Sequence, residues 1–326
     1  MNEQRPYERL LPIFGSELTV TDAPHLAAAW TFSRQRLLRI RSVLQDLPSP
    51  IACVAVSGSL CRMEAHHGSD LDLLLVIDDR DRIVSDDEAT DLYRWVWQRI
   101  RQDSELSDLK APKPGGVFSS CVFCRKLLDE SVRGRVDEDL TSYGQRMQLL
   151  LDAQPLAGDD RFTHLQAQLL HWFSETRNAE LFGEAGPFHW LILEVQRYWT
   201  SIRARACWIH PDEPAKALEV NIKLRSTRLL LFSAFLRTIS SAQKHHSKPG
   251  ELTAAVMNAL HLTPLERIMS AQNPTKQTRL SLLSAYELAH RMLSQLPDSQ
   301  ALTPSLITAL QSLHRGLLPI AEMDAV

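Results

Sequence analysis

The stretch VAVSGSLCRMEAHHGSDLDLLLVIDD, residues 54–79, decides the fold of this chain. An apolar run, residues 51–56, leads into it, and a second, mostly apolar run follows at residues 70–77. Both runs have the length and the aliphatic content of buried strands. Ser57-Gly58-Ser59 and a polar loop separate them. We therefore predict two buried strands, with a Gly-Ser turn at the end of the first.

The residues at the strand ends indicate chemistry with phosphate and metal. Glycine has no side chain, so backbone N–H groups at Gly58 can approach an anion closely. Asp70 and Asp72 are two apart on the second predicted strand, and the period of two places both carboxylates on the same face. Two close carboxylates repel each other and are best tolerated around a divalent cation. Oxygen ligands favour Mg²⁺ or Mn²⁺ over zinc. This pattern predicts a site for phosphoryl or nucleotidyl transfer.

The same residues resemble a known signature. Gly58-Ser59, ten intervening residues and then Asp70-Leu71-Asp72 are similar to the motif of the DNA polymerase β nucleotidyltransferase superfamily. The segment resembles most closely the nucleotidyltransferase domain of the uridylyltransferases that modify the nitrogen-regulatory signalling protein, and related bacterial nucleotidyltransferases of unknown substrate.

The resemblance extends beyond the central motif. Arg62 and Glu64 resemble the Arg-x-Glu that often follows the Gly-Ser turn in this superfamily. A weaker likeness covers residues 115–125, 141–159 and 188–228. The specific motif covers about a tenth of the chain.

The resemblance implies a reaction and roles for its residues. A nucleoside monophosphate is transferred from an NTP to an acceptor hydroxyl, and pyrophosphate is released. Gly58 and Ser59 would hold the β- and γ-phosphates, and Asp70 and Asp72 would bind Mg²⁺ or Mn²⁺ in a two-metal mechanism.

The superfamily also uses a third carboxylate on a neighbouring strand. Asp152 holds the acidic position in the family-like stretch and is our first choice as a third catalytic and metal-binding residue. Asp129, Glu130 and Asp137 remain alternatives.

Other candidate nucleotide contacts are Arg62, Ser69, Lys223 and Arg225. Arg62 either contacts phosphate or pairs with Glu64 to brace the loop. In the superfamily, a helical domain often closes over the nucleotide and supplies Lys or Arg to the triphosphate, which is the role that Lys223 and Arg225 would have. The alternative for these two is a solvated helix face.

The flanking sequence predicts the remaining architecture. Residues 23–47 and 85–102 have the apolar spacing of helices, and Ser85 is a candidate N-cap before three acidic residues. Residues 117–124 form a candidate third strand, and from residue 163 the chain is leucine-rich and predicted helical. We therefore predict an α+β chain. A nucleotidyltransferase domain with a small mixed β-sheet and an N-terminal helix spans residues 1–162, and an all-α helical bundle spans residues 163–326, with a cleft between the two.

Composition restricts the class of protein. With 44% hydrophobic and 23% charged residues, the 326-residue chain can bury a sizeable core. Its net charge of −3 gives no global electrostatic case for nucleic-acid binding. Its apolar runs fall well short of the ~20 residues of a membrane span, the first residues are too polar for a signal peptide, and five cysteines is an odd, sparse count for a secreted protein. We expect a cytoplasmic protein with no membrane partner.

The sequence leaves two functions open. The first is an NTP-dependent nucleotidyltransferase whose acceptor is a protein, an RNA or a small molecule. The second is a catalytically inactive module that binds nucleotide, or another protein, through the same fold. Oligomeric state and base preference are not predicted.

Overall fold

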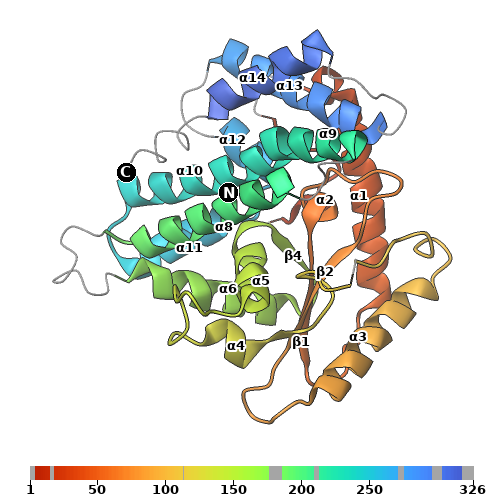
Figure 1. The fold of residues 1–326 in the computed structure, drawn as a ribbon, viewed down its shortest axis with the longest axis vertical. Coiled ribbons are helices and arrows are strands. Elements are labelled where there is room, and N and C mark those ends of the chain that lie inside the picture. Colours follow the sequence, from red (N-terminus) through yellow and green to blue (C-terminus); the bar gives the residue numbers. More distant parts are fainter. Residues whose placement is uncertain are drawn as a thin grey trace. The chain divides into compact units, whose positions relative to one another are not determined.

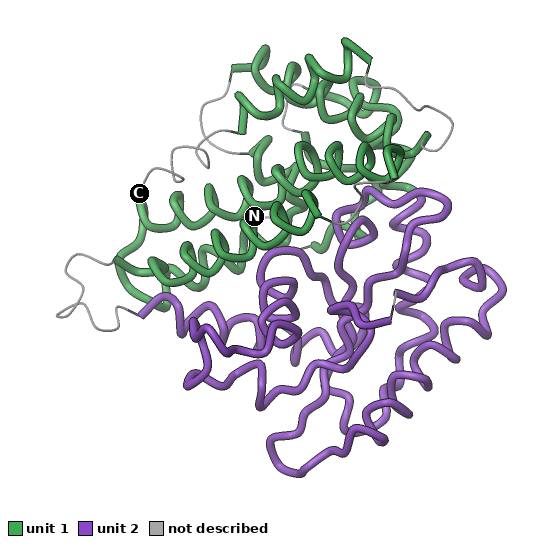
Figure 2. Tube along the Cα trace, viewed as in Figure 1, with its two compact units in different colours: residues 1–31, 178–326 green, residues 32–177 purple. Residues whose placement is uncertain are grey.

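The computed structural model describes residues 4–14, 18–112, 114–175, 186–208, 213–270, 275–295 and 303–317. The fold is α+β, as predicted, with a small mixed sheet and many helices (Figure 1). The chain divides into two compact units (Figure 2). Residues 32–177 form what we call the sheet unit, and residues 1–31 with 178–326 form the helical unit.

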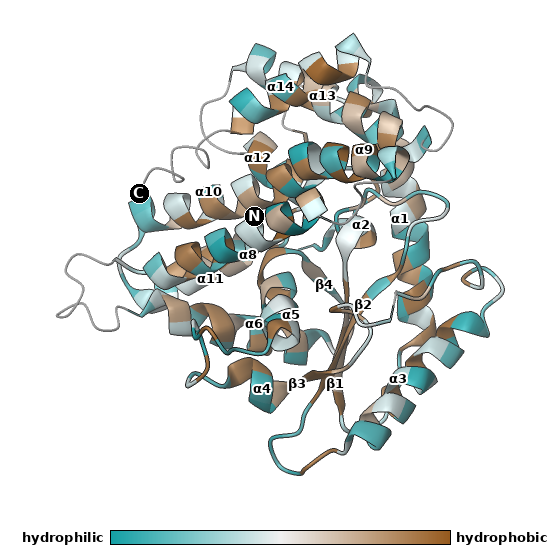
Figure 3. Cartoon of the chain, viewed as in Figure 1, coloured by the Kyte–Doolittle hydropathy of each residue, from teal (hydrophilic) through white to brown (hydrophobic). Residues whose placement is uncertain are grey.

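The sheet has four strands in the order β3-β2-β1-β4. They are β1 (Ile51–Ser57), β2 (Asp72–Ile77), β3 (Val122–Phe123) and β4 (Ala153–Ala157). β1 pairs antiparallel with both β2 and β4, whereas β2 and β3 are parallel. β1 and β2 are buried almost along their whole length and are coloured as hydrophobic in Figure 3, which confirms the two predicted central strands.

The helices of the sheet unit begin with α1 (Pro24–Val43), which crosses the unit boundary after Thr31, and continue with α2 (Gly58–Cys61), α3 (Asp86–Arg101), α4 (Cys124–Leu128), α5 (Leu140–Leu151) and α6 (Asp159–Ser174). α1 and α3 confirm the two helices predicted in this half. Ser85 caps α3, because its side chain accepts a hydrogen bond from the Glu88 N–H at 3.2 Å.

The predicted third strand is mostly wrong. Only Val122 and Phe123 are extended, and Cys124 already begins α4. A turn in which the Ser119 N–H donates to the Gly116 carbonyl at 3.0 Å diverts the chain before the strand begins. α5 and β4 were also not predicted from the sequence. For β4 the reason is that its five residues, with Pro155 among them, lack a strand pattern. β4 is an edge strand, where proline is tolerated.

The helical unit contains α8 (His189–Trp208), α9 (Pro214–Lys223), η3 (Leu224–Arg228), α10 (Leu229–His245), α11 (Pro249–Ala259), α12 (Pro264–Ser270), α13 (Lys276–Gln295) and α14 (Pro304–Leu317). Two short 3₁₀ turns, Pro6–Glu8 and Val20–Asp22, precede α1. Among the described residues, no helix is both long and apolar enough to cross a membrane.

The division into units differs from the sequence-based boundary at residue 162 in two ways. First, α6 packs against β1 and β4, so it belongs with the sheet. Second, the N-terminal segment belongs with the helices. Phe14, Leu18 and Leu26 lie in the helical core, and Glu266, fully buried, binds the Arg9 guanidinium at 2.6 and 2.9 Å.

Candidate functional site

The candidate site is built at one edge of the sheet, where β1 ends. Ser57, the last residue of β1, pairs with Asp72 on one side and with Ala153 on the other. Because β2 and β4 both run antiparallel to β1, their first residues lie at this same edge. The fold therefore brings Asp72 and Asp152, which directly precedes β4, beside the turn at Gly58.

Gly58 is required at the turn for two reasons. Its φ is +73°, a left-handed conformation that L side chains rarely adopt. In addition, a Cβ added at this position would lie 2.5 Å from Oδ2 of Asp72. The Asp72 carboxylate, which is half-buried, is therefore close against the turn backbone.

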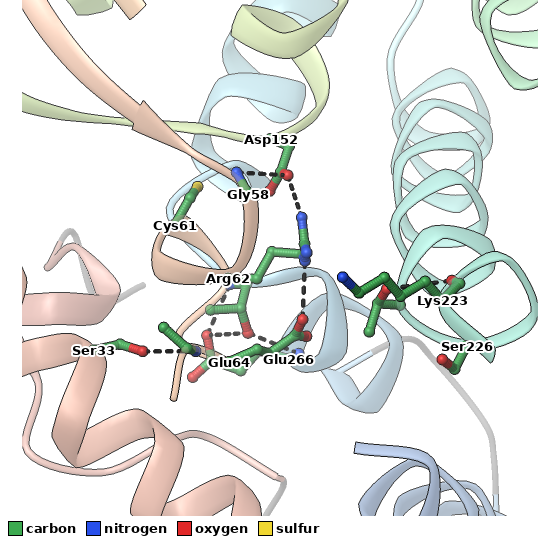
Figure 4. Close-up of polar contacts among 12 residues, drawn as sticks. Ser33, Gly58, Cys61, Arg62, Glu64, Asp152, Lys223, Ser226 and Glu266 are labelled. Carbon is green, nitrogen blue, oxygen red and sulfur yellow. Dashed lines mark hydrogen bonds and ion pairs between the residues drawn. The ribbon is translucent and has the colours of Figure 1, made fainter. Parts of the chain in front are cut away.

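Asp152 contacts the same glycine, as Figure 4 shows. Asp152 is 5% exposed. Its Oδ2 accepts hydrogen bonds from the Gly58 N–H at 3.2 Å and from Nη1 of Arg62. Its Oδ1 is buried and has no hydrogen-bond partner among the described residues. Burial of a carboxylate oxygen without a hydrogen bond costs free energy, so the environment of Oδ1 destabilises the fold unless another group binds it.

Arg62 connects Asp152 to a second buried acid. The Arg62 Nε donates to Oε2 of Glu64 at 2.9 Å, and Glu64 is 6% exposed. The N–H of Glu64 donates to the Ser59 carbonyl at 2.8 Å. The N–H of Ala65 donates to the hydroxyl oxygen of Ser33, in α1, at 3.0 Å. The predicted pairing of Arg62 with Glu64 is confirmed, and it braces the turn.

Asp70 is placed differently from Asp72. It is exposed and precedes β2, where it forms an isolated parallel bridge with Lys110. The predicted second strand therefore begins two residues later than expected. Within the described ranges, no three His, Cys, Asp or Glu side chains gather as a metal-binding group. Asp70, Asp72 and Asp152 are thus not assembled as a ready three-ligand set.

The two predicted serines have different positions. Ser59 lies in α2, half-buried, directly after Gly58. Ser69 is used to close the loop before β2, because its hydroxyl accepts from the His66 N–H at 3.1 Å and its own N–H donates to the His66 carbonyl at 3.0 Å.

Lys223 and Arg225 lie in the helical unit. Lys223 ends α9, and its Nζ contacts Oε1 of Glu219 at 2.6 Å, while Lys216 contacts Oε2 at 2.5 Å. Partial burial acts to raise the pKa of Glu219, but the hydrogen bonds from both lysines outweigh it and lower that pKa to about 2. Arg225 is exposed in η3, a π-helical segment of a kind that often marks functional sites.

The alternative third carboxylates are exposed and lie outside this arrangement. Asp129 accepts hydrogen bonds from the backbone and hydroxyl of Ser131 at 2.9 and 2.6 Å, and Asp137 pairs with Arg135 at 2.8 Å. Glu130 is also exposed. Of the four acids considered, Asp152 is the one for which a contact with Gly58 is described.

Two further polar residues at this edge were missed from the sequence. The Ser57 hydroxyl donates to Oε1 of Gln148 at 2.5 Å, and Nε2 of Gln154 donates to the Cys61 carbonyl at 2.9 Å. Both glutamines lie in elements, α5 and β4, that the sequence pattern did not predict. The one sequence signal for these two glutamines was that each is a polar residue within an otherwise apolar run.

The oxygen ligands that Asp72 and Asp152 offer are of the kind that a hard divalent cation prefers. Asp72 approaches Gly58 from β2, and Asp152 approaches it from the position just before β4. The buried Oδ1 of Asp152 is an oxygen without a hydrogen-bond donor among the described residues. Oxygen donors of this kind select Mg²⁺ or Mn²⁺. Asp72 and Asp152 are therefore the residues best placed to hold a cation, with Asp70 close by in sequence.

No family model matches the chain, and a search of curated proteins found no match. The resemblance to the polymerase β superfamily therefore stays a prediction, and the function has to be argued from the geometry of the site.

Proposed function

We propose that this chain is a Mg²⁺-dependent nucleotidyltransferase, which moves a nucleoside monophosphate from an NTP to an acceptor hydroxyl. The observation that carries the proposal is the position of two carboxylates, Asp72 and Asp152, on either side of the Gly58 turn at one sheet edge. A glycine turn allows a phosphate to approach the backbone, and carboxylates beside it balance the charge of a bound cation.

Each group in this arrangement has a role in the proposed reaction. The acceptor oxygen forms a bond to the α-phosphorus, the bond to pyrophosphate breaks, and the hydroxyl proton passes to a base. Asp152, with a carboxylate oxygen that has no donor among the described residues, is our candidate for that base. Asp72 and Asp152, with Asp70, would hold Mg²⁺ or Mn²⁺, which supplies Lewis-acid stabilisation of the phosphate charge.

The acceptor is a protein, an RNA or a small molecule. The net charge of −3 gives slight weight against a long RNA, since RNA binding draws on positive charge. The nucleotide-binding role of Lys223 and Arg225, which lie in the helical unit, stays a prediction from the resemblance. Lys223 is paired with Glu219, whereas Arg225 is exposed.

A second candidate function is an inactive module that binds nucleotide or a protein partner. The observation that favours it is the engagement of Asp152 by Arg62, together with the finding that no three-ligand group is assembled in the described part of the chain. A carboxylate fixed in an ion pair can serve the fold alone.

Labelled nucleotides separate the two functions. The purified protein is incubated with labelled ATP, GTP, CTP or UTP, Mg²⁺ and cell lysate, beside the variant Asp70→Asn/Asp72→Asn. The enzyme reading predicts label transfer or pyrophosphate release that the double variant lacks. Nucleotide binding without turnover in any lysate would favour the inactive module instead.

A further inference from the structure

The guanidinium of Arg62 contacts Asp152, the buried carboxylate that is our candidate cation ligand. Its Nη1 donates to Oδ2 of Asp152, the same oxygen that accepts the Gly58 N–H (Figure 4). The side chains of Arg62 and Asp152 are 13% and 3% exposed, so the pair is largely shielded from water. A charge-assisted contact in such surroundings is much stronger than one at the surface.

A second acid, Glu64, also binds Arg62 and fixes the side chain that contacts Asp152. Nε of Arg62 donates to Oε2 of Glu64, whose side chain is 6% exposed. Glu64 is itself fixed, because its N–H donates to the carbonyl of Ser59. One arginine therefore bridges two buried carboxylates and has little freedom to move unless one of the two contacts breaks.

The ion pair leaves the carboxylate incompletely satisfied. Oδ1 of Asp152 is buried and receives no hydrogen bond from the described residues. If Arg62 were only a brace for the fold, a second donor to Oδ1 would be the stabilising arrangement. Oδ1 is therefore the oxygen that a cation would contact, and a cation there would share the carboxylate with the Arg62 guanidinium on Oδ2.

We propose that Arg62 is a built-in competitor for the cation site: it occupies Asp152 while no divalent cation is bound, and cation binding and the Arg62–Asp152 ion pair exclude each other. This inference rests on the proposed function, because it takes Asp152 as a cation ligand. A guanidinium and a divalent cation on one buried carboxylate repel each other, so the site binds cation only when Arg62 withdraws. Arg62 is thus a positioning residue that sets the cation affinity.

The two possible roles of Arg62 predict different changes in Mn²⁺ affinity when Arg62 is replaced. Replacement of Arg62 by Gln removes the competing charge, so the protein without nucleotide binds Mn²⁺ more tightly, by about tenfold. If Arg62 only braces the turn, the same change loosens Asp152 and weakens Mn²⁺ binding or leaves it unchanged.

The test measures free Mn²⁺ by electron paramagnetic resonance during titration of the protein without nucleotide. The matched control is Arg82→Gln, which removes an equal charge from an exposed arginine of the same unit that pairs with Glu88 at 2.6 Å. We expect tighter binding for Arg62→Gln, unchanged binding for Arg82→Gln, and loss of the gain when Asp152→Asn is added to Arg62→Gln. An equal gain in Arg82→Gln, or a gain that survives Asp152→Asn, would overturn the proposal.

A measurement on the unaltered protein covers the case in which Arg62→Gln does not fold. The chain is labelled with ¹⁵N-arginine and titrated with Mg²⁺, and the Arg62 side-chain signal is assigned from its absence in Arg62→Lys. Displacement from Asp152 predicts a saturable shift of that signal at the cation concentration that fills the site. A signal that stays in place while the cation binds would contradict the proposal.

The two titrations also distinguish failure of this inference from failure of the proposed function. Mn²⁺ binding that Asp72→Asn abolishes, but that Arg62→Gln does not strengthen, leaves the cation site in place and overturns only the role of Arg62. If neither the unaltered protein nor Arg62→Gln binds Mn²⁺, the cation site itself is wrong and both proposals fall.

Discussion

Strand β2 has an acidic pair at each end, and the two pairs have different surroundings. Asp70 and Asp72 stand at its start, and Asp78 and Asp79 directly follow its end. At the far end, Asp78 pairs with Arg80 at 2.6 Å, and Asp79 accepts from the first-turn N–H of Arg125 at 2.9 Å. Both acids there are held in contacts near the surface, Asp78 by Arg80 and Asp79 by the backbone of α4.

The start of β2 differs because the neighbouring strands add to it. Gly58, in a left-handed conformation, directly follows β1, and the buried carboxylate of Asp152 directly precedes β4. An acidic pair at a strand end is therefore not by itself a site. Here the candidate site arises from what two adjacent strands place beside Asp72.

The largest effect expected from this comparison is on turnover. Asp72→Asn should reduce Mg²⁺-dependent pyrophosphate release by about a thousandfold, equivalent to about 4 kcal/mol, because a ligand oxygen loses its charge. The matched change at the other end, Asp78→Asn, should leave turnover unchanged. Steady-state assays of both variants give the answer.

Thermal unfolding provides the control for this first prediction. Asp72→Asn should leave the melting temperature unchanged or raise it, since it relieves repulsion with the other carboxylates in the absence of cation. A large loss of stability would show that Asp72 is structural, and equal losses of turnover in the two variants would remove the distinction between the ends of β2.

The next effect concerns the glycine turn. Gly58→Ala should lower the free energy of unfolding by about 2 kcal/mol. It adds left-handed strain, and the Asp72 carboxylate has to move, because its Oδ2 would lie 2.5 Å from the new Cβ. Gly68→Ala is the matched control: its φ is +89°, but its added Cβ would meet only Nζ of Lys110, at 3.9 Å. We expect it to cost about 1 kcal/mol, from strain alone. Urea unfolding of both proteins measures the difference, and equal costs would show that the Asp72 carboxylate does not press on the turn.

The smallest effect is at the far end of β2 and depends on pH. The hydrogen bonds donated by Arg80 lower the pKa of Asp78 below its ordinary value of 3.8. A lowered pKa means that the charged form stabilises the fold, so the contribution is present above that ordinary value and is lost as pH falls below it. Asp78→Asn should therefore cost about 0.5 kcal/mol at neutral pH, and this cost should shrink as pH falls below 3.8. A cost that does not change with pH would mean that the ion pair is not its source.

Much of the fold could be predicted from the sequence, because its strongest signals are local. The two apolar runs gave β1 and β2, and the amphipathic spacing with Ser85 as N-cap gave α3. β4 could not be predicted, because its stability comes from pairing with β1 rather than from the strand propensity of its own five residues. The grouping of the N-terminal segment with the C-terminal helices has no local signal, since the contact between Arg9 and Glu266 joins residues far apart in the chain.

The candidate site was predictable where the motif is continuous in sequence. Gly58 and Asp72 lie together because one turn and one strand pairing join them. Asp152 was selected by resemblance alone, and its contact with Gly58 depends on β4. The position of Asp70 outside the strand reflects the Lys110 bridge, which no local pattern shows. The engagement of Asp152 by Arg62 required the tertiary structure as well.

The most direct test of the central claim is a crystal structure with a non-hydrolysable NTP and Mn²⁺. We predict a triphosphate against the backbone at Gly58, a Mn²⁺ ion bound by Asp72 and Asp152, and the Arg62 guanidinium displaced from Asp152. A nucleotide bound away from Gly58, with no metal at Asp72, would contradict the account.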